Sequence, residues 1–388
     1  MYNNILVINL MHLGDLMLVT PVLRTLRKNF PAAKISLLAD KKLADIVNLN
    51  RNIDDCIFID KKGADNNFAN FVKFILKLRE KNFDLVINLH RNERASALAA
   101  FSGAKKIVGY SKPLFSIFFD KVFPNPSIAQ LKPKYIPGTQ HQVKSHFDVL
   151  REAVGVEKIF DNGLEMWIDD AAKNSAEKIF AENFPANIKV VAFNIGASWL
   201  TKRWIDSYFA QVADNLIRRG YGVAFLGGTM DEEIVAACVE QMREKNNPLL
   251  KIFTGQFSLA ELAGFLDKCV LMLTTDSGPM HVGVARNIPI VTMFGASPVP
   301  GFYPYDAKDI LIKSPENCHP CGKHLCPRKG EENLACMKNI SVEVVLKYVD
   351  ELLETYGQAA ENIPRVYGQY QCCVIELAKN IDSKTIGN

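Results

Sequence analysis

The sequence predicts an α/β fold built from two Rossmann-like halves, each with a parallel sheet. Short apolar runs alternate with amphipathic stretches along most of the chain, and this alternation is typical of βαβ units. The chain has 388 residues, more than one hydrophobic core usually serves, so we expect two domains and a terminal part. The predicted ranges are 1–170, 185–340 and, for a C-terminal helix and tail, 341–388.

In the first half, short apolar runs predict strands at Ile5–Leu10, Ile35–Ala39, Cys56–Ile59, Leu85–Leu89 and Ile107–Gly109. Apolar residues at helical spacing predict helices at Met17–Asn29 and Lys42–Leu49. The aromatic stretch Lys112–Phe123 is predicted as a buried helix, with an anchor at a membrane interface as the alternative.

In the second half, the predicted strands are Val190–Asn194, Val223–Leu226, a run from Val270 to Thr275, and a last strand at Ile290–Phe294. The predicted helices are Ile205–Arg219, Asp231–Lys245, Leu259–Leu266, Ser341–Tyr356 and a short one at Val374–Ala378, with a frayed end at 383–388. In such a fold, a ligand binds in the cleft between the halves, outside the carboxyl ends of the strands.

Composition and charge narrow the class of partner. Hydrophobic residues make up 48% and charged residues 23% of the chain, which is ordinary for a globular enzyme. No apolar run is long enough for a membrane span, and the N-terminus lacks the basic region of a signal peptide, so we expect a cytosolic protein.

Residues 1–150 hold 22 Lys and Arg against 12 Asp and Glu, and residues 151–388 hold 24 against 30. The basic first half favours an anionic partner such as a phosphorylated lipid or a membrane surface, and a solvated surface is the alternative. Nothing resembles a nucleic-acid motif, so we exclude that partner.

The most informative turn is Asp276-Ser-Gly-Pro-Met-His281, which joins the strand ending at Thr275 to a helix. Asp276 or Ser277 can cap that helix, and Gly278 lets a ligand approach the backbone. The free N–H groups of a helix N-terminus bind anions. The turn therefore predicts a phosphate site in which His281 is a further donor, and a plain strand-to-helix turn is the alternative.

A second turn, at Gly14-Asp15, follows the first strand. A carboxylate at this edge of a doubly wound sheet faces the cleft and can act as a general base on a hydroxyl. The alternative is that Asp15 only caps the next helix.

Two further loops follow strands of the second half. Ser198, Thr201, Lys202 and Arg203 lie in the first loop and suit a phosphate, unless the loop is simply basic surface. The second loop contains Gly227-Gly228 and leads to Asp231 and Glu232. It would allow a nucleoside close to the backbone, although glycine is common in any tight turn.

Four cysteines fall within a short stretch, at Cys318, Cys321, Cys326 and Cys336. In a cytosolic protein, such clustering favours a metal over disulfides, and four thiolates can hold a structural zinc ion. Reduced thiols without a metal are the alternative.

The order of these motifs resembles that of the family-9 glycosyltransferases, the ADP-heptose:lipopolysaccharide heptosyltransferases. The resemblance runs from about residue 4 to 350 and rests on Gly14-Asp15, Lys202-Arg203-Trp204, Gly227-Gly228, Asp276-Ser-Gly-Pro-Met-His281 and Gly295-Ala-Ser-Pro298. It implies a GT-B fold, with two Rossmann-like domains whose parallel sheets face a central cleft. It also implies inverting transfer that needs no metal or other cofactor.

The resemblance implies a role for each matched residue. Asp15 would be the general base, and Lys202 would stabilise the leaving diphosphate. The donor would be bound by Ser198, Thr201, Gly228, Glu232, Asp276, Ser277, Gly278 and His281, with Asp276 on the sugar hydroxyls. By region alone, Arg91, Arg94, Lys112 and His141 would contact the acceptor.

The implied partners are ADP-heptose and an anionic acceptor of the lipid A and Kdo type, at the cytoplasmic face of the inner membrane of a Gram-negative bacterium. Three alternatives remain open at this point: a transferase for another nucleotide sugar, a nucleotide-sugar epimerase of the same fold, and a catalytically silent nucleotide-binding protein.

Overall fold

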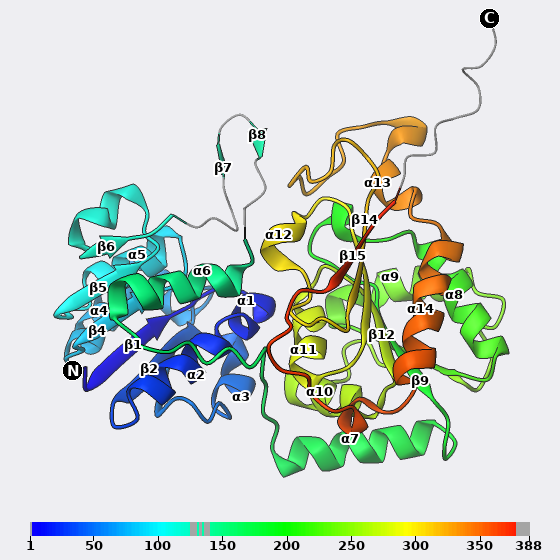
Figure 1. Cartoon of the computed structure of the whole chain (residues 1–388), viewed down its shortest axis with the longest axis horizontal. Helices are drawn as coiled ribbons and strands as arrows, with labels where there is room; N and C mark the ends of the chain where they lie inside the picture. Colours follow the sequence, from blue (N-terminus) through cyan, green and yellow to red (C-terminus); the bar gives the residue numbers. More distant parts are fainter. Residues whose placement is uncertain (1, 125–129, 132–133, 136–139, 378–388) are drawn as a thin grey trace, which may run out of the picture.

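The structure is a computed structural model that describes residues 2–124, 130–131, 134–135 and 140–377. Two parallel sheets with helices on both faces form two domains side by side, joined by a linker at residues 155–169 (Figure 1). The α/β fold with two Rossmann-like halves is confirmed.

The first domain has a six-stranded sheet in the order β3-β2-β1-β4-β5-β6, with every pair parallel. Its strands are β1 (Asn4–Ile8), β2 (Lys34–Asp40), β3 (Asp55–Ile59), β4 (Leu85–Asn88), β5 (Lys106–Gly109) and β6 (Lys121–Val122). Its helices are α1 (Leu13–Met17), α2 (Thr20–Asn29), α3 (Ala44–Val47), α4 (Phe68–Arg79), α5 (Glu93–Ala100) and α6 (Gln142–Val149), the last continued by a π turn at Leu150–Val154. A small antiparallel pair, β7 (Gln130–Leu131) and β8 (Lys134–Tyr135), stands apart from this sheet.

The second domain has a seven-stranded parallel sheet in the order β11-β10-β9-β12-β13-β14-β15. Its strands are β9 (Val190–Asn194), β10 (Gly222–Leu226), β11 (Leu250–Ile252), β12 (Leu271–Thr275), β13 (Ile290–Phe294), β14 (Ile310–Lys313) and β15 (Cys373–Glu376). Its helices are α7 (Asp170–Asn183), α8 (Asp206–Arg218), α9 (Glu232–Val239), α10 (Leu259–Lys268), α11 (Gly278–Arg286), α12 (Val299–Phe302), α13 (Ala335–Lys338) and α14 (Val342–Tyr356).

The buried strands explain how helices cover both faces of each sheet. Side chains alternate between faces along a strand, and in β1 Ile5 and Val7 join one core cluster while Leu6 and Ile8 join another. The cluster that contains Ile5 also includes residues of α10, α11 and β9 of the second domain. One apolar core therefore continues across the domain boundary and holds the two sheets in a fixed relation.

The strand order reverses between β1 and β4 in the first sheet and between β9 and β12 in the second. In a doubly wound sheet this reversal opens a crevice at the carboxyl ends of the strands. Asp15, Lys202 and Asp276 lie in the segments that follow β1, β9 and β12.

The prediction of a buried helix at Lys112–Phe123 is wrong. A short 3-10 helix spans Pro113–Phe118, and the side chains of Leu114 and Ile117 are 77% and 83% exposed. Apolar composition predicted burial, but the turn packs only Phe115 inward, against Phe101.

The C-terminal part differs from its prediction as well. Residues 373–376 form the strand β15 beside β14, where a short helix was predicted. The strand at Ile290–Phe294 is consequently not the last one. A short apolar run fits either a strand or a helix, and here the open edge of the sheet determines which one forms. The predicted frayed end at 383–388 lies outside the described residues.

Three predicted helices differ from the structure in extent. The stretch Met17–Asn29 divides between α1 and α2, and the helix predicted to reach Lys245 ends at Val239. The helix predicted at Lys42–Leu49 is the short α3, which follows a 3-10 turn at Lys41–Leu43. In the described part of the chain, no helix is both long and apolar enough to cross a bilayer.

Candidate functional site

The two domains meet where α1 and α11 begin. A Cβ atom on Gly14 would lie 2.9 Å from Cδ2 of His281, and one on Gly278 would lie 3.1 Å from Cβ of Leu13. A larger residue at Gly14 would force the helices apart. The loop after the first strand of one domain therefore touches the helix after β12 of the other, and the candidate site forms around this contact.

Asp15 is the third residue of α1, on the first-domain side of the contact. Burial is the largest influence on its carboxyl group and raises its pKa to about 6. Lys202 lowers this pKa and Asp276 raises it, so charges from the second domain act on Asp15. The alternative role as N-cap is wrong, because His12 occupies that position and no side chain caps the helix there.

Lys202 and Asp276 form an ion pair on the second-domain side, with 2.7 Å between Nζ and Oδ2. The hydroxyl of Ser297 donates a short hydrogen bond to the same carboxylate oxygen. Burial raises the pKa of Asp276, but the Lys202 charge and these hydrogen bonds outweigh it and hold the pKa below its ordinary value. Asp276 is therefore ionised and fixes the ammonium group of Lys202 at the cleft.

The N-terminus of α11 has no side-chain cap. Ser277 is the N-cap residue, but its hydroxyl accepts a hydrogen bond of 2.9 Å from Nδ2 of Asn194 and makes no capping bond. The prediction that Asp276 or Ser277 caps this helix is thus wrong. The first N–H groups of the helix have no partner within it, so they can bind an anion in the cleft.

His281 lies one turn into α11 and is almost fully buried. Burial lowers its pKa to about 4, so the imidazole is neutral at pH 7. Its Nδ1 atom is buried and lacks a hydrogen-bond partner among the described residues. A neutral ring with a free nitrogen can donate to or accept from one ligand atom, but it adds no charge.

The other residues that were predicted to bind the donor differ in burial and in hydrogen bonding. Ser198 and Gly228 are exposed, and Glu232 is exposed at the start of α9. The hydroxyl of Thr201 is buried and donates to the carbonyl of Lys323 in the cysteine-containing loop. This bond attaches that loop to the loop of Lys202.

On the first-domain side, three predicted acceptor residues lie together at the start of α5. Arg91 is exposed, Arg94 donates to the carbonyl of Lys61 over 2.8 Å, and Lys112 pairs with Glu93 at 3.2 Å. His141 is not with them. It is buried, its Nε2 lies 3.1 Å from the carbonyl oxygen of Tyr303, and its ring stacks on Tyr305. It joins the two domains and presents no free ring nitrogen to a ligand.

Several polar residues of the site were not found from the sequence. Asn194, Trp199 and Ser297 hold the second-domain side, where the ammonium of Lys202 also lies 4.5 Å above the Trp199 ring. On the first-domain side, Lys61 pairs with Asp40 at 2.8 Å. Their position was the available signal, because Asp40, Asn194 and Ser297 each end or closely follow a strand, at the carboxyl edge of its own sheet.

The first domain leaves large apolar side chains exposed on α4 and along the segment from the end of α5 to β6; we call this set the apolar face. Phe101 touches both Phe115 and Phe118, which joins the end of α5 to the 3-10 helix at 113–118. The exposed side chains are those of Phe68, Val72, Leu76, Phe101, Leu114, Ile117, Phe118 and Val122. A monomer rarely leaves so many large apolar side chains uncovered on neighbouring elements.

The four clustered cysteines lie in the loop after β14 and at the start of α13, and all are free. Burial and then the three neighbouring thiols raise the pKa of Cys336 to about 12. Among the described residues, no group of three or more His, Cys, Asp or Glu is arranged to hold a metal ion. Structural zinc stays a prediction.

Comparison with known proteins agrees with this geometry. Residues 71–331 match the family described as glycosyltransferase family 9 (heptosyltransferase). Lipopolysaccharide heptosyltransferase 3 of Escherichia coli K12 is 29% identical over 290 residues, which cover 73% of this chain and 80% of that protein.

Solved structures show the same architecture. A family 9 glycosyl transferase from Veillonella parvula has a TM-score of 0.79 and 34% identity, over 91% of this chain and 98% of that one. ADP-heptose LPS heptosyltransferase II of E. coli has a TM-score of 0.71 and 20% identity, over 91% and 99% of the two chains. The overall architecture is therefore the GT-B fold.

Proposed function

The chain belongs to glycosyltransferase family 9 and is a sugar-transferring enzyme; from this premise we propose that it transfers heptose from ADP-heptose to the inner core of lipopolysaccharide. One observation carries the proposal: Asp15, whose pKa is raised, lies within electrostatic reach of the Lys202–Asp276 ion pair of the other domain, and Asp276 comes just before the uncapped N-terminus of α11. The names of the relatives, which are heptosyltransferases, support the choice of sugar and acceptor.

Asp15 removes the proton from the acceptor hydroxyl in the proposed reaction. A base with a pKa of about 6 is ionised at pH 7 and still basic enough to share a proton in the transition state. The hydroxyl oxygen forms a bond to the anomeric carbon while the bond from that carbon to the diphosphate oxygen breaks on the opposite face. The product therefore has inverted configuration, and Asp15 carries the proton.

The leaving diphosphate gains negative charge as that bond breaks. Lys202 and the first N–H groups of α11 supply the compensating positive charge. Such preorganised donors stabilise the transition state without a reorganisation cost. Because these groups already provide positive charge, we propose that transfer needs no metal ion. Asp276 orients Lys202 and binds sugar hydroxyls, Ser198 binds the diphosphate, and Gly228 and Glu232 line the nucleoside end.

The proposed acceptor is an anionic lipid carrying Kdo or heptose. Arg91, Arg94 and Lys112 form a basic group on the first-domain side of the cleft. The apolar face lies on the same domain, so we propose that it rests on the cytoplasmic side of the inner membrane while the acceptor headgroup enters the cleft. Apolar side chains flanked by basic ones are typical of proteins that bind at a membrane surface.

The donor is tested with a panel of ADP- and UDP-linked sugars. ADP-heptose should raise the melting temperature most, because a ligand that binds only the folded state stabilises it more, at a given concentration, the lower its dissociation constant is. Stabilisation by a different nucleotide sugar, and none by ADP-heptose, would favour another transferase of the same fold. Turnover of the donor without any acceptor would instead indicate an epimerase.

The role of metals is tested on the same preparation. Treatment with EDTA should leave the transfer rate within about twofold of the untreated enzyme, because the proposed charge stabilisation comes from the chain. Metal analysis of the purified protein then tests for zinc at the four clustered cysteines. About one zinc ion per chain would support a structural zinc site, and a stoichiometry near zero would rule it out.

A further inference from the structure

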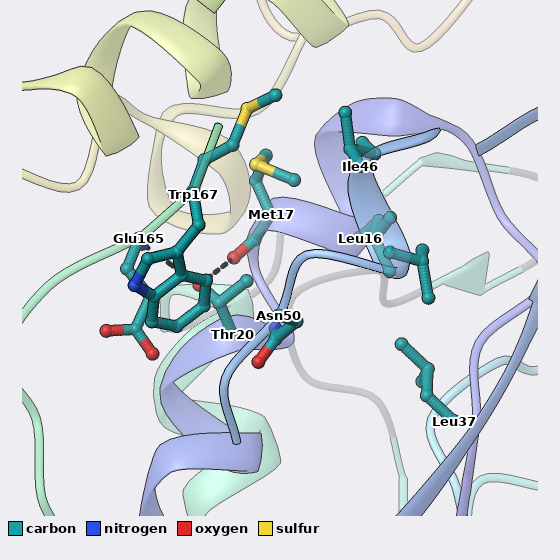
Figure 2. A pocket seen from close by; sticks show the side chains of 10 residues that line it. Leu16, Met17, Thr20, Leu37, Ile46, Asn50, Glu165 and Trp167 are labelled. Atoms are coloured by element: carbon teal, nitrogen blue, oxygen red, sulfur yellow. Dashed lines mark hydrogen bonds between the residues drawn. The ribbon is translucent and has the colours of Figure 1, made fainter. Parts of the chain in front are cut away.

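A cavity of about 290 Å³ lies where the linker passes between the domains. Its wall includes Trp167 of the linker, Arg286 at the last position of α11, and Tyr367 of the C-terminal tail. The candidate site uses the opposite end of α11, about 12 Å away at 1.5 Å per residue. Figure 2 shows the other side of this linker segment, where Glu165 and Trp167 lie against Met17 and Thr20 of the first domain.

Three arginines from separate parts of the chain bind carbonyl groups of the linker around this cavity. Arg24 of α2 donates to Gly163 over 3.0 Å. Arg365 of the tail donates to Leu164 over 3.1 Å through Nη1, and its Nη2 donates to the carbonyl of Ala285 in α11. Arg286 donates to Met166 over 2.6 Å. The cavity wall therefore joins the first domain, the second domain and the tail.

The charges around the cavity do not balance. Arg24 pairs with Glu165, and Arg286 pairs with Asp267. Within residues 2–124 and 140–377, no carboxylate lies at ion-pair distance from Arg365. Burial, and then the charge of Arg286, lower the pKa of Arg365. Its guanidinium group thus has no carboxylate partner in that part of the chain, lies near a second arginine, and belongs to a residue that is open to solvent.

We propose that this cavity binds a small oxyanion, a phosphate or carboxylate group, between Arg365 and Arg286. A guanidinium group presents a planar set of donors that fits two oxygens of such an anion. The volume is near the lower limit for small-molecule sites, so the ligand is small. Trp167 and Tyr367 can cover an attached planar or sugar group. The bound anion would neutralise Arg365 and tie the tail to the linker.

The experiment uses full-length protein that carries Lys202→Ala, so that anions in the candidate site contribute little. Inorganic phosphate, pyrophosphate and succinate are titrated while the melting temperature is followed, and sodium chloride at equal ionic strength is the reference. A saturable rise beyond the chloride reference is expected for at least one anion. Phosphate and succinate as separate arms show which oxyanion the site prefers.

Arg365→Gln should weaken this binding at least tenfold, because it removes the charge and half of the planar donor set. Arg365→Lys keeps the charge and should lose less. Arg51→Gln, at an exposed arginine of the first domain, is the matched control and should bind as the parent does. Equal binding by the parent and Arg365→Gln, or no response beyond chloride, would overturn the proposal.

A second readout serves if Arg365→Gln does not fold. The chain has three tryptophans, and only Trp167 lines the cavity. Adding the anion should change the tryptophan fluorescence of the parent but not that of Trp167→Phe. A change that persists in Trp167→Phe would also overturn the proposal.

Discussion

The charged groups on the two sides of the candidate site differ in burial and in pairing. On the second-domain side, Lys202, Asp276 and Ser297 are bound to one another and largely buried. On the first-domain side, Arg91 is exposed and the apolar face lies uncovered nearby. A compact ligand of constant shape, such as a diphosphate, suits the second-domain side, because the charged groups of the protein there are already fixed in position before the ligand binds. A large amphipathic ligand suits the first-domain side, because an open basic surface can accept different shapes.

Replacing Asp15 by Asn tests whether the two sides meet in one reaction. Transfer should fall about 10³-fold, because general-base catalysis contributes roughly 10²–10⁴ to the rate. Binding of ADP, measured by calorimetry, should change little, because the amide has the same size and lies opposite the diphosphate. Full activity in this variant would eliminate Asp15 as the base.

Replacing Lys202 by Ala tests the paired charges of the second-domain side. Transfer should fall about 10²-fold, the effect of removing one preorganised donor. The variant should also lose roughly 3 kcal/mol of unfolding free energy, because Asp276 is left buried without its cation. The double variant Lys202→Ala with Asp276→Asn should recover much of this stability but none of the activity. Denaturant titration and a transfer assay separate the two results; equal stability of single and double variants would argue against the ion pair.

The pH dependence of transfer reports the environment of Asp15. Its pKa is raised to about 6 by burial, and the base works only when ionised. Hence kcat/KM should be constant above about pH 7 and fall about tenfold per pH unit well below 6. His281, with a pKa of about 4, is neutral over this range and contributes no limb. A limb near the ordinary pKa of an aspartate would contradict a buried base.

Charging the apolar face tests the open side. The variant Leu114→Glu with Ile117→Glu should bind anionic vesicles about tenfold more weakly, because apolar area is lost and negative charge is added. Its activity on a water-soluble acceptor fragment should be unchanged. Ile252→Glu, at an exposed position of the second domain, serves as control in a vesicle sedimentation assay. Unchanged sedimentation of the double variant would show that this face does not bind the membrane.

The sequence predicted the parts of the site that depend on strand-to-helix turns. Asp15, Lys202 and Asp276 follow strands whose apolar runs are unambiguous, and parallel strands bring their carboxyl ends to one edge. The fold class and most strands of both sheets followed from the same pattern. The contacts of Asp276 with Lys202 and Ser297 did not, because three loops distant in sequence must meet before those contacts exist.

The failures have a common physical reason. Apolar composition at 112–123 predicted burial, yet a short turn has no second face to bury, and Leu114 and Ile117 remain exposed. The apolar run at 374–378 fits either a helix or a strand. Residues 373–376 form a strand because β14, a distant segment, offers a free sheet edge for pairing. In both places the deciding partner, or its absence, lies far away in the chain.

The position of β15 near the end of the sequence means that the second sheet is completed later in synthesis than the first. All strands of the first sheet end by residue 122, whereas the second sheet gains its outer strand only from residues 373–376. Until those residues leave the ribosome, β14 has an unpaired edge, and such edges are where partly made chains associate wrongly. The nascent protein thus spends the whole synthesis of the region between β14 and β15 with this edge uncovered. Its yield should therefore be sensitive to translation speed along that stretch.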